Sequence, residues 1–143
     1  MEEQKPRLQP IQQILCDDVR VEANGKFILI GVYADGLLVP SFPTQLLLSL
    51  WMTFRCVGIG KVPVGLQVRG PGQEDKIEMQ TETDLRQDGR VNSLVVGGLS
   101  FRATEPSEIK VLFRQYQEEW ELLSKFTIGK LDVPASAYGE SKS

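Results

Sequence analysis

Histidine is missing from the whole chain of 143 residues. Histidine is the usual general base near neutral pH, the usual partner of a nucleophilic serine or cysteine, and the commonest ligand of transition metals. An enzyme made from this sequence would have to use carboxylates, lysine, tyrosine or a hard cation. We therefore expect a protein that is not an enzyme and that uses no cofactor and no metal.

An excess of positive charge and long apolar runs are absent as well. The chain has 16 Lys and Arg against 19 Asp and Glu, for a net charge of −3, so it lacks the basic footprint that phosphate neutralisation requires. The run "LLLSLWM" is much shorter than the ~20 residues of a membrane helix, and the opening "MEEQKPRLQP" lacks the apolar core of a signal peptide. We expect a cytoplasmic protein that binds neither nucleic acid nor membrane.

Cysteine is scarce, with Cys16 and Cys56 as its only occurrences, and each lies in an apolar, strand-like segment. Two cysteines do not make a disulfide framework. The sequence predicts two buried free thiols, and the alternative is a bridge between neighbouring strands in an oxidising compartment.

The chain is rich in turn signals, which recur at short intervals between segments of Val, Ile, Leu, Phe and Thr. They include Asn24-Gly25, Pro40, Pro63, "RGPGQEDK", "RQDGR", Gly97-Gly98 and Glu105-Pro106. This spacing predicts an all-β fold, an immunoglobulin-like antiparallel β-sandwich of about seven to nine strands. We expect one domain over residues 11–133, with loose segments at 1–10 and 134–143.

The Asn24-Gly25 pair lies between strand-forming segments and predicts a two-residue type I′ turn, in which both residues have positive φ. In that register Val21 lies opposite Ile28. Successive strand residues point to opposite faces, so one face of this hairpin is almost continuously apolar and is expected to face the core: Leu15, Val19, Val21, Ile28, Ile30 and Val32. The other face carries Cys16, Asp18, Arg20, Glu22, Phe27, Leu29, Gly31 and Tyr33.

The same alternation separates Asp17 from Asp18. Asp18 is expected to pair with Arg20 across from Gly31, as an exposed ion pair worth less than ~1 kcal/mol. Asp17 interrupts the apolar face. It either turns outward at a sheet rim and accepts backbone N–H bonds, or a bulge brings both aspartates to one side, where they could hold a hard cation.

Residues 107–128 fit two structures. Ile109, Leu112, Phe113, Tyr116, Trp120 and Leu123 recur at helical spacing. A hairpin with a turn around Gln117 and Glu118 also gives each strand an apolar side, and the all-β context favours it. A hairpin is expected here, with a C-terminal helix as the alternative.

The run "CDDVRVEANGKFILIGVYADGLLVPSFP" resembles the opening of a family of small bacterial and phage proteins with no assigned function. The matching features are Asp-Asp-Val-Arg, Glu22, Asn24-Gly25-Lys26, Leu29-Ile30-Gly31-Val32-Tyr33 and the Val39-Pro40 and Phe42-Pro43 steps, which cover roughly the first third of the chain. The resemblance implies a compact β-sandwich, and no catalytic residue is carried over from it.

Surplus apolar residues predict the function. Phe27, Leu29 and Tyr33 share a face with Arg20 and Glu22, and Trp51 lies on the second face of its strand. An exposed patch of this kind typifies an interaction site, unless the C-terminal segment of the chain covers it. We expect a protein-binding or assembly module that forms a homo-oligomer through Arg20, Phe27, Leu29, Tyr33, Trp51 and Arg55.

Two other functions stay open. A small anionic, nucleotide-like ligand could be bound by the arginines, namely Arg20, Arg55, Arg69, Arg102 and Arg114. A hydrolase based on two carboxylates would draw on the acidic residues of the first hairpin, namely Asp17, Asp18, Glu22 and Asp35. Of these, Asp18 and Asp35 share a face and make the only geometrically sensible pair.

Overall fold

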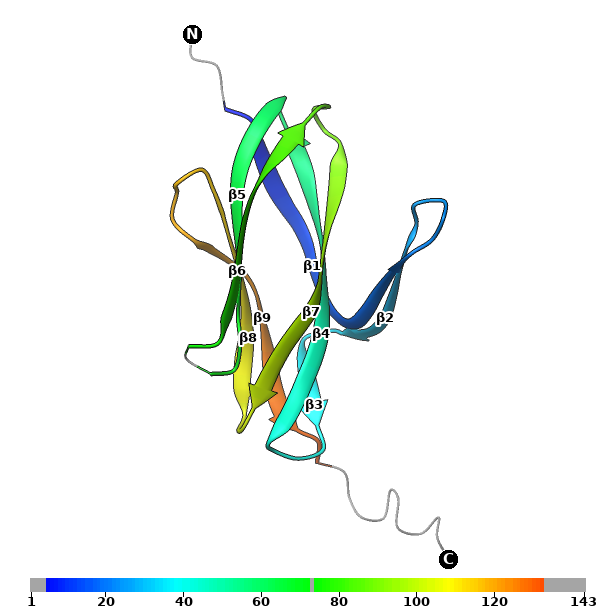
Figure 1. Ribbon diagram of the computed structural model, residues 1–143, viewed down its shortest axis with the longest axis vertical. Helices are drawn as coiled ribbons and strands as arrows, with labels where there is room; N and C mark the ends of the chain where they lie inside the picture. The colour runs from blue at the N-terminus through cyan, green and yellow to red at the C-terminus, as the bar shows by residue number, and fades with distance from the viewer. Residues whose placement is uncertain (1–4, 73, 133–143) are drawn as a thin grey trace, which may run out of the picture.

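The computed structural model describes residues 5–72 and 74–132, and within them the chain forms nine β-strands and no helix (Figure 1). The strands are β1 (Arg7–Val21), β2 (Phe27–Tyr33), β3 (Gly36–Val39), β4 (Thr44–Val57), β5 (Gly60–Arg69), β6 (Lys76–Leu85), β7 (Val91–Ala103), β8 (Ser107–Gln115) and β9 (Glu121–Lys130). The expected loose segment 1–10 thus includes the start of β1, and the expected tail at 134–143 lies outside the described residues.

Two sheets pack face to face, which confirms the predicted all-β sandwich. One sheet has the order β2-β1-β4-β7, and the other has the order β3-β9-β8-β5-β6. β3 runs parallel to β9, and the other pairs of neighbouring strands are antiparallel.

The core lies between the sheets, and the residues that β4 contributes to it follow the period of two of a β-strand. Every second residue of β4 points inward and is at most 8% exposed: Leu46, Leu48, Leu50, Met52, Phe54 and Cys56. Each fully buried Leu or Met side chain contributes about 1.5–3 kcal/mol. Opposite this row, Val62, Val68, Ile109, Val111 and Phe113 complete the core from β5 and β8.

Gly97 and Gly98, one of the turn signals of the sequence, form a bulge in β7. Leu48 pairs with Leu99 and Leu50 pairs with Val96, so two glycines lie opposite the single residue Ser49. An extra residue on one strand bends that strand locally. The bulge keeps Val96 and Leu99 both on the buried side.

Residues 107–128 form the β8–β9 hairpin, and the helical alternative is wrong. β8 lies between β5 and β9, with Leu112 paired to Gln67 on one side and Leu122 on the other. Leu112 is itself only 8% exposed. A central strand that buries residues on both faces carries apolar residues at helical as well as strand spacing, which explains the ambiguity.

The two cysteines are buried free thiols, as predicted. Cys16 lies in β1 and Cys56 in β4, where Cys56 pairs with Leu8 at the other end of the strand pair. Burial raises the pKa of both thiols.

Gln115 joins the two sheets through the core. Its Oε1 accepts from the Leu8 N–H at 2.6 Å, and its Nε2 donates to the Leu8 carbonyl at 2.9 Å. Gln115 is 6% exposed, and Leu8 belongs to β1 of the opposite sheet. The side-chain amide of Gln115 therefore exchanges two hydrogen bonds with the backbone of β1, as a neighbouring strand would, and links the two sheets.

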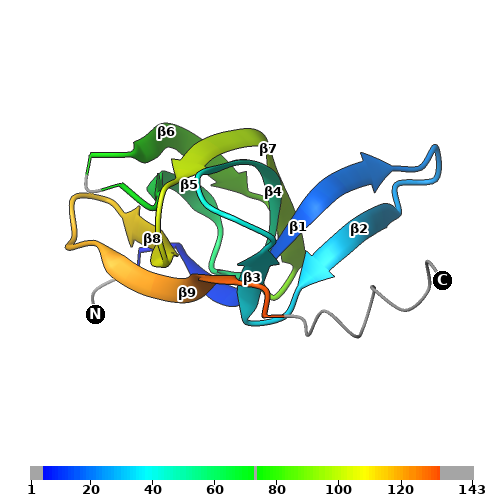
Figure 2. The same ribbon diagram turned by 90° about the horizontal axis from the view of Figure 1, so that it is seen from below.

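The first hairpin leaves the sandwich. β1 pairs with β4 from Arg7 to Cys16 and with β2 from Leu15 to Val21. Beyond Cys16 it therefore keeps only β2 as a neighbour. Residues 17–33 extend away from the two sheets, on the right of Figure 1 and more clearly in Figure 2; we call this segment the arm.

The predicted type I′ turn and its register are wrong. The Gly25 N–H donates to the Glu22 carbonyl at 2.9 Å, and the Glu22 N–H donates to the Lys26 carbonyl at 2.8 Å. Gly25 has a φ of 87°, while Asn24 is not among the residues with positive φ. The loop thus has three residues, a type I turn followed by a glycine bulge.

The extra loop residue moves β2 by one position against β1. Val21 pairs with Phe27, and Val19 pairs with Leu29. A shift of one residue moves every side chain of a strand to the other face. Phe27, Leu29 and Tyr33 therefore share a face with Leu15, Val19 and Val21, and the expected apolar core face of this hairpin does not exist.

Candidate functional site

The arm exposes an unusual number of large apolar side chains for its length. Five large apolar side chains on it are exposed, with exposed fractions from 37% for Phe27 to 63% for Val21; the others are Ile28, Ile30 and Val32. Elsewhere on the described surface, exposed apolar residues are spread over several strands. Three of the five, Ile28, Ile30 and Val32, lie on one face of β2 as an exposed apolar row, and exposed apolar surface of this kind marks an interaction site.

The base of the arm is held by a contact between Asp17 and Tyr33. The Tyr33 hydroxyl donates a hydrogen bond to Asp17 Oδ1. Burial, followed by this hydrogen bond, raises the pKa of Tyr33 to about 12. Gly31 has a φ of 69°, and a side chain there would collide with the carboxylate of Asp17. Asp17 is thus exposed and bonded to a phenol, which differs from both alternatives the sequence left open for it.

Near the tip of the arm, Phe27 contacts Trp51 on the outer face of β4. The two rings pack edge to face, with 6.1 Å between their centroids and an interplanar angle of 62°. Val19 and Leu29, on the same face of the arm as Phe27, are half-buried. The indole Nε1 of Trp51 and the hydroxyl of Thr53 are both buried and without a hydrogen-bond partner in the described residues. The arm therefore has an inner side toward β4 and an outer side toward solvent.

The outer side carries the residues that the sequence misplaced. Ile28, Ile30 and Val32 alternate with the inner residues along β2 and are 41%, 41% and 53% exposed. Sequence reasoning assigned them to the core because an apolar row normally faces inward. No local sequence signal marks their exposure, which follows from the position of β2 at the edge of its sheet.

The predicted interface residues are only partly brought together. Phe27 and Leu29 lie on the inner side of the arm, where Phe27 contacts Trp51 of β4, and Tyr33 packs against the core at the base of the arm. Arg20 is exposed and pairs with Asp18 at 3.2 Å, as predicted. Arg55 is separate from this group: it lies near the far end of β4 and donates to the Gly89 carbonyl at 3.1 Å.

The acidic residues of the first hairpin do not form a carboxylate pair. Asp17 is bonded to Tyr33, and Asp18 is bonded to Arg20. Glu22 lies in the loop at the arm's tip, and Asp35 lies in the bend after β2; both are exposed. Within the described part of the chain, no group of three or more Cys, Asp or Glu residues could hold a metal ion.

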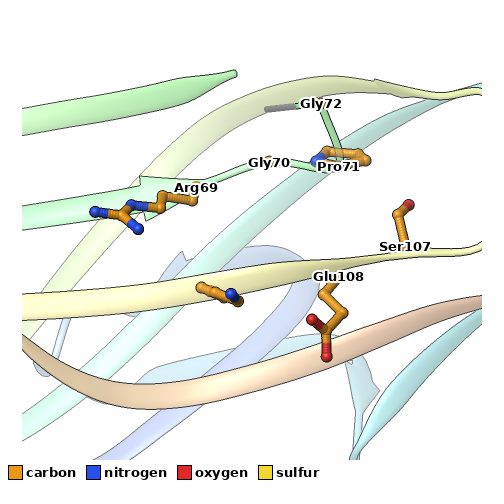
Figure 3. A pocket seen from close by; sticks show the side chains of 7 residues that line it. Arg69, Gly70, Pro71, Gly72, Ser107 and Glu108 are labelled. Atoms are coloured by element: carbon orange, nitrogen blue, oxygen red, sulfur yellow. The ribbon is translucent and has the colours of Figure 1, made fainter. Parts of the chain in front are cut away.

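The arginines that could bind an anion lie on five different strands. Arg69 donates to Gln67 at 2.7 Å, and Arg114 stacks on Trp120 at 4.6 Å from the ring centroid. A surface pocket of about 350 Å³ lies beside Arg69, with Gly70, Pro71, Gly72, Ser107, Glu108 and Lys110 around it. In Figure 3, Arg69 runs along its strand, while Ser107 and Glu108 point to opposite sides of β8. These side chains do not converge on one point.

A second, more enclosed cavity lies at the open edge of the sandwich between β6 and β7. Its volume is about 80 Å³, and its lining is mostly apolar, including Leu8, Phe54 and Phe113. Ligand pockets usually measure about 300–1,000 Å³. This cavity is thus a packing defect between two edge strands.

The described residues include no helix of the length and apolarity that crossing a membrane would require. Comparison of the chain with protein-family models and with curated proteins found no match. The immunoglobulin-like topology, the bacterial or phage origin and the cytoplasmic location therefore stay predictions.

Proposed function

We propose that this protein is a non-enzymatic assembly module that self-associates through the arm. The observation that carries the proposal is the exposure of five large apolar side chains on a two-stranded projection. An isolated two-stranded hairpin is marginally stable in water. Further strands or a packed surface would stabilise it, and a second protein surface supplies both.

The arm's chemistry favours an interface over an active site. Its two aspartates are each occupied by a partner within the arm, Tyr33 for Asp17 and Arg20 for Asp18. The side chains that β2 directs toward solvent are aliphatic, and the Asp18–Arg20 ion pair of β1 lies beside them. Aliphatic and aromatic side chains with one arginine are the usual composition at the centre of an interface.

The oligomeric state of the full chain at micromolar concentration tests this proposal. We expect native mass spectrometry and light scattering to find a dimer or a larger oligomer. Replacing Ile28 and Val32 together by Lys should give a monomer with an unchanged circular dichroism spectrum, because both side chains are exposed in one copy.

Ile59→Lys is the matched control, because Ile59 is 68% exposed in the turn between β4 and β5. This variant should associate as the natural chain does. A natural chain that is strictly monomeric, or an Ile28→Lys/Val32→Lys variant that still associates, would overturn the proposal.

A further inference from the structure

The outer edge of β2 has no strand beside it in the described residues. β2 ends its sheet, with β1 as its single neighbour. Natural proteins protect such edges with lysine, proline, inward-pointing charges or a covering segment. The strand itself, "FILIGVY", has seven residues and contains no charge and no proline. An edge of this composition pairs readily with another strand.

The backbone of β2 is in phase for such pairing from Phe27 to Ile30, the part of the strand before the left-handed Gly31. The Glu22 N–H donates to the Lys26 carbonyl, and hydrogen-bonded and non-hydrogen-bonded pairs alternate along an antiparallel ladder. The Arg20–Ile28 and Asp18–Ile30 pairs therefore belong to the hydrogen-bonded class. The backbone groups of Phe27 and Leu29 are consequently directed to the open edge.

Opposite charges stand at the two ends of β2. Lys26 directly precedes the strand, and Asp35 follows it by two residues. Both are exposed, and neither takes part in the ion pairs found among the described residues. An antiparallel arrangement of two β2 strands brings the start of one beside the end of the other.

We infer that the occupant of this edge is a second copy of the chain, whose β2 pairs antiparallel with the first about a twofold axis at Ile30. This inference rests on the proposed self-association and specifies its geometry. Ile30 then lies opposite Ile30 of the second copy, Phe27 lies opposite Tyr33, and Ile28 lies opposite Val32. Lys26 then lies opposite Ala34 of the second copy, one position from Asp35, and the symmetry repeats this approach of opposite charges.

The arrangement accounts for three features at once. It joins two marginal hairpins into one four-stranded sheet. It places Ile28, Ile30 and Val32 of both copies on one side, as a continuous apolar row. It also brings Lys26 of each copy close to Asp35 of the other, whereas a parallel arrangement would place Lys26 beside Lys26 and Asp35 beside Asp35, where like charges repel.

Disulfide trapping tests the register. In Ile30→Cys the two new thiols face each other across the axis, within the Cα separation of 4.4–6.8 Å that a disulfide needs. We expect most of this variant to form a covalent dimer on mild oxidation, as seen on a non-reducing gel. Ile28→Cys is the matched control, because Ile28 and Ile30 are both 41% exposed and Ile28 is far from its own counterpart in this register.

Mixing two variants sharpens the test. Ile28→Cys and Val32→Cys should each stay uncrosslinked alone and should form a heterodimer when mixed, because these positions face each other across the axis. Cys16 and Cys56 are buried, so the natural chain should show no crosslink.

Charge reversal gives a second measurement that does not depend on a new thiol. Lys26→Glu and Asp35→Lys should each raise the Kd of self-association by on the order of ten-fold, since each turns two attractions into repulsions. The double variant should restore most of the affinity. A rescue of this kind is not expected if the two residues never meet.

The outcomes separate this inference from the proposed function. An oligomer in which Ile30→Cys crosslinks no better than Ile28→Cys, and in which the charge reversals are not rescued, would overturn the twofold pairing of β2 and leave self-association standing. A monomeric natural chain would overturn both.

Discussion

The hydroxyl of Tyr33 donates a hydrogen bond to the carboxylate of Asp17 at the point where the arm leaves the sandwich. Tyr33 packs against the core. Asp17 is the first residue of β1 after the last one that pairs with β4. This bond therefore connects the arm to the folded body.

The ionisation of Tyr33 should be delayed to high pH. Its pKa is about 12 in the folded protein, against about 10 for an ordinary tyrosine. Because the folded pKa is raised, the contribution of Tyr33 to stability is complete below about pH 10 and is lost as the pH rises toward 12. Ultraviolet absorbance of the tyrosinate should show one late transition that Tyr33→Phe removes.

Asp17→Asn should move that transition to lower pH, because the carboxylate that disfavours tyrosinate is gone. Asp18→Asn is the control, since Asp18 is bonded to Arg20 and not to Tyr33. If both variants titrate alike, Asp17 does not govern the ionisation of Tyr33.

Gly31→Ala should destabilise the protein by about 2 kcal/mol, because the left-handed backbone strains any other residue and the new methyl group meets Asp17. Gly31 has a φ of 69°, and its position is covered by the Asp17 carboxylate. Gly25→Ala is the matched control: its φ is 87°, but a side chain there meets nothing within 4 Å. Urea unfolding should show a larger loss for Gly31→Ala.

The part of the Gly31→Ala cost that comes from Asp17 can be isolated. In an Asp17→Ala background the loss should shrink to that of Gly25→Ala. An unchanged loss in that background would show that backbone strain alone explains the effect.

Gln115→Leu should cost about 2–3 kcal/mol of stability, because it leaves the N–H and the carbonyl of Leu8 buried without partners. Both bonds, at 2.6 and 2.9 Å, lie inside the protein. Gln117→Leu is the control, because Gln117 is exposed in the turn after β8. Thermal unfolding of the two variants should differ clearly. Equal melting temperatures would mean that the amide of Gln115 does not stabilise the contact between the sheets.

The strands of the sandwich were predictable where one face of a strand is apolar. The row from Leu46 to Cys56 alternates without error, so β4 and its buried side follow from the period of two. The hairpin at 107–128 was predicted from its all-β context, because Leu112 in a strand buried on both faces obscures the local pattern.

The arm was not predictable, for two physical reasons. Asn24-Gly25 suits a two-residue turn and a three-residue turn with a glycine bulge almost equally, and the choice moves β2 by one residue. The separation of β1 from β4 after Cys16 is a property of the assembled sheet, and no local pattern marks it. An apolar row such as Ile28, Ile30 and Val32 is expected to face the core, and only the assembled fold shows that no second sheet covers it.

The contact between Phe27 and Trp51 was not predictable for the same reason, because it joins β2 to β4, two strands that are not neighbours in their sheet. Gln115 and Leu8 are likewise 107 positions apart. Sequence patterns place residues on faces, but they do not show which faces meet.

Phe27→Ala should expose Trp51 to water and shift its fluorescence emission to longer wavelength. Phe27 covers the indole edge to face at 6.1 Å, and such pairs contribute about 0.5–1.5 kcal/mol beyond the area they bury. Because Trp120 also emits, the measurement belongs in a Trp120→Phe background. Ile28→Ala is the control on the outer side of the arm and should leave the emission unchanged. A red shift with Ile28→Ala, or none with Phe27→Ala, would mean that the arm does not rest on Trp51 in solution. The expected pattern would establish that the inner side of the arm is occupied within one copy, so that the row of Ile28, Ile30 and Val32 is the side left open to a second copy.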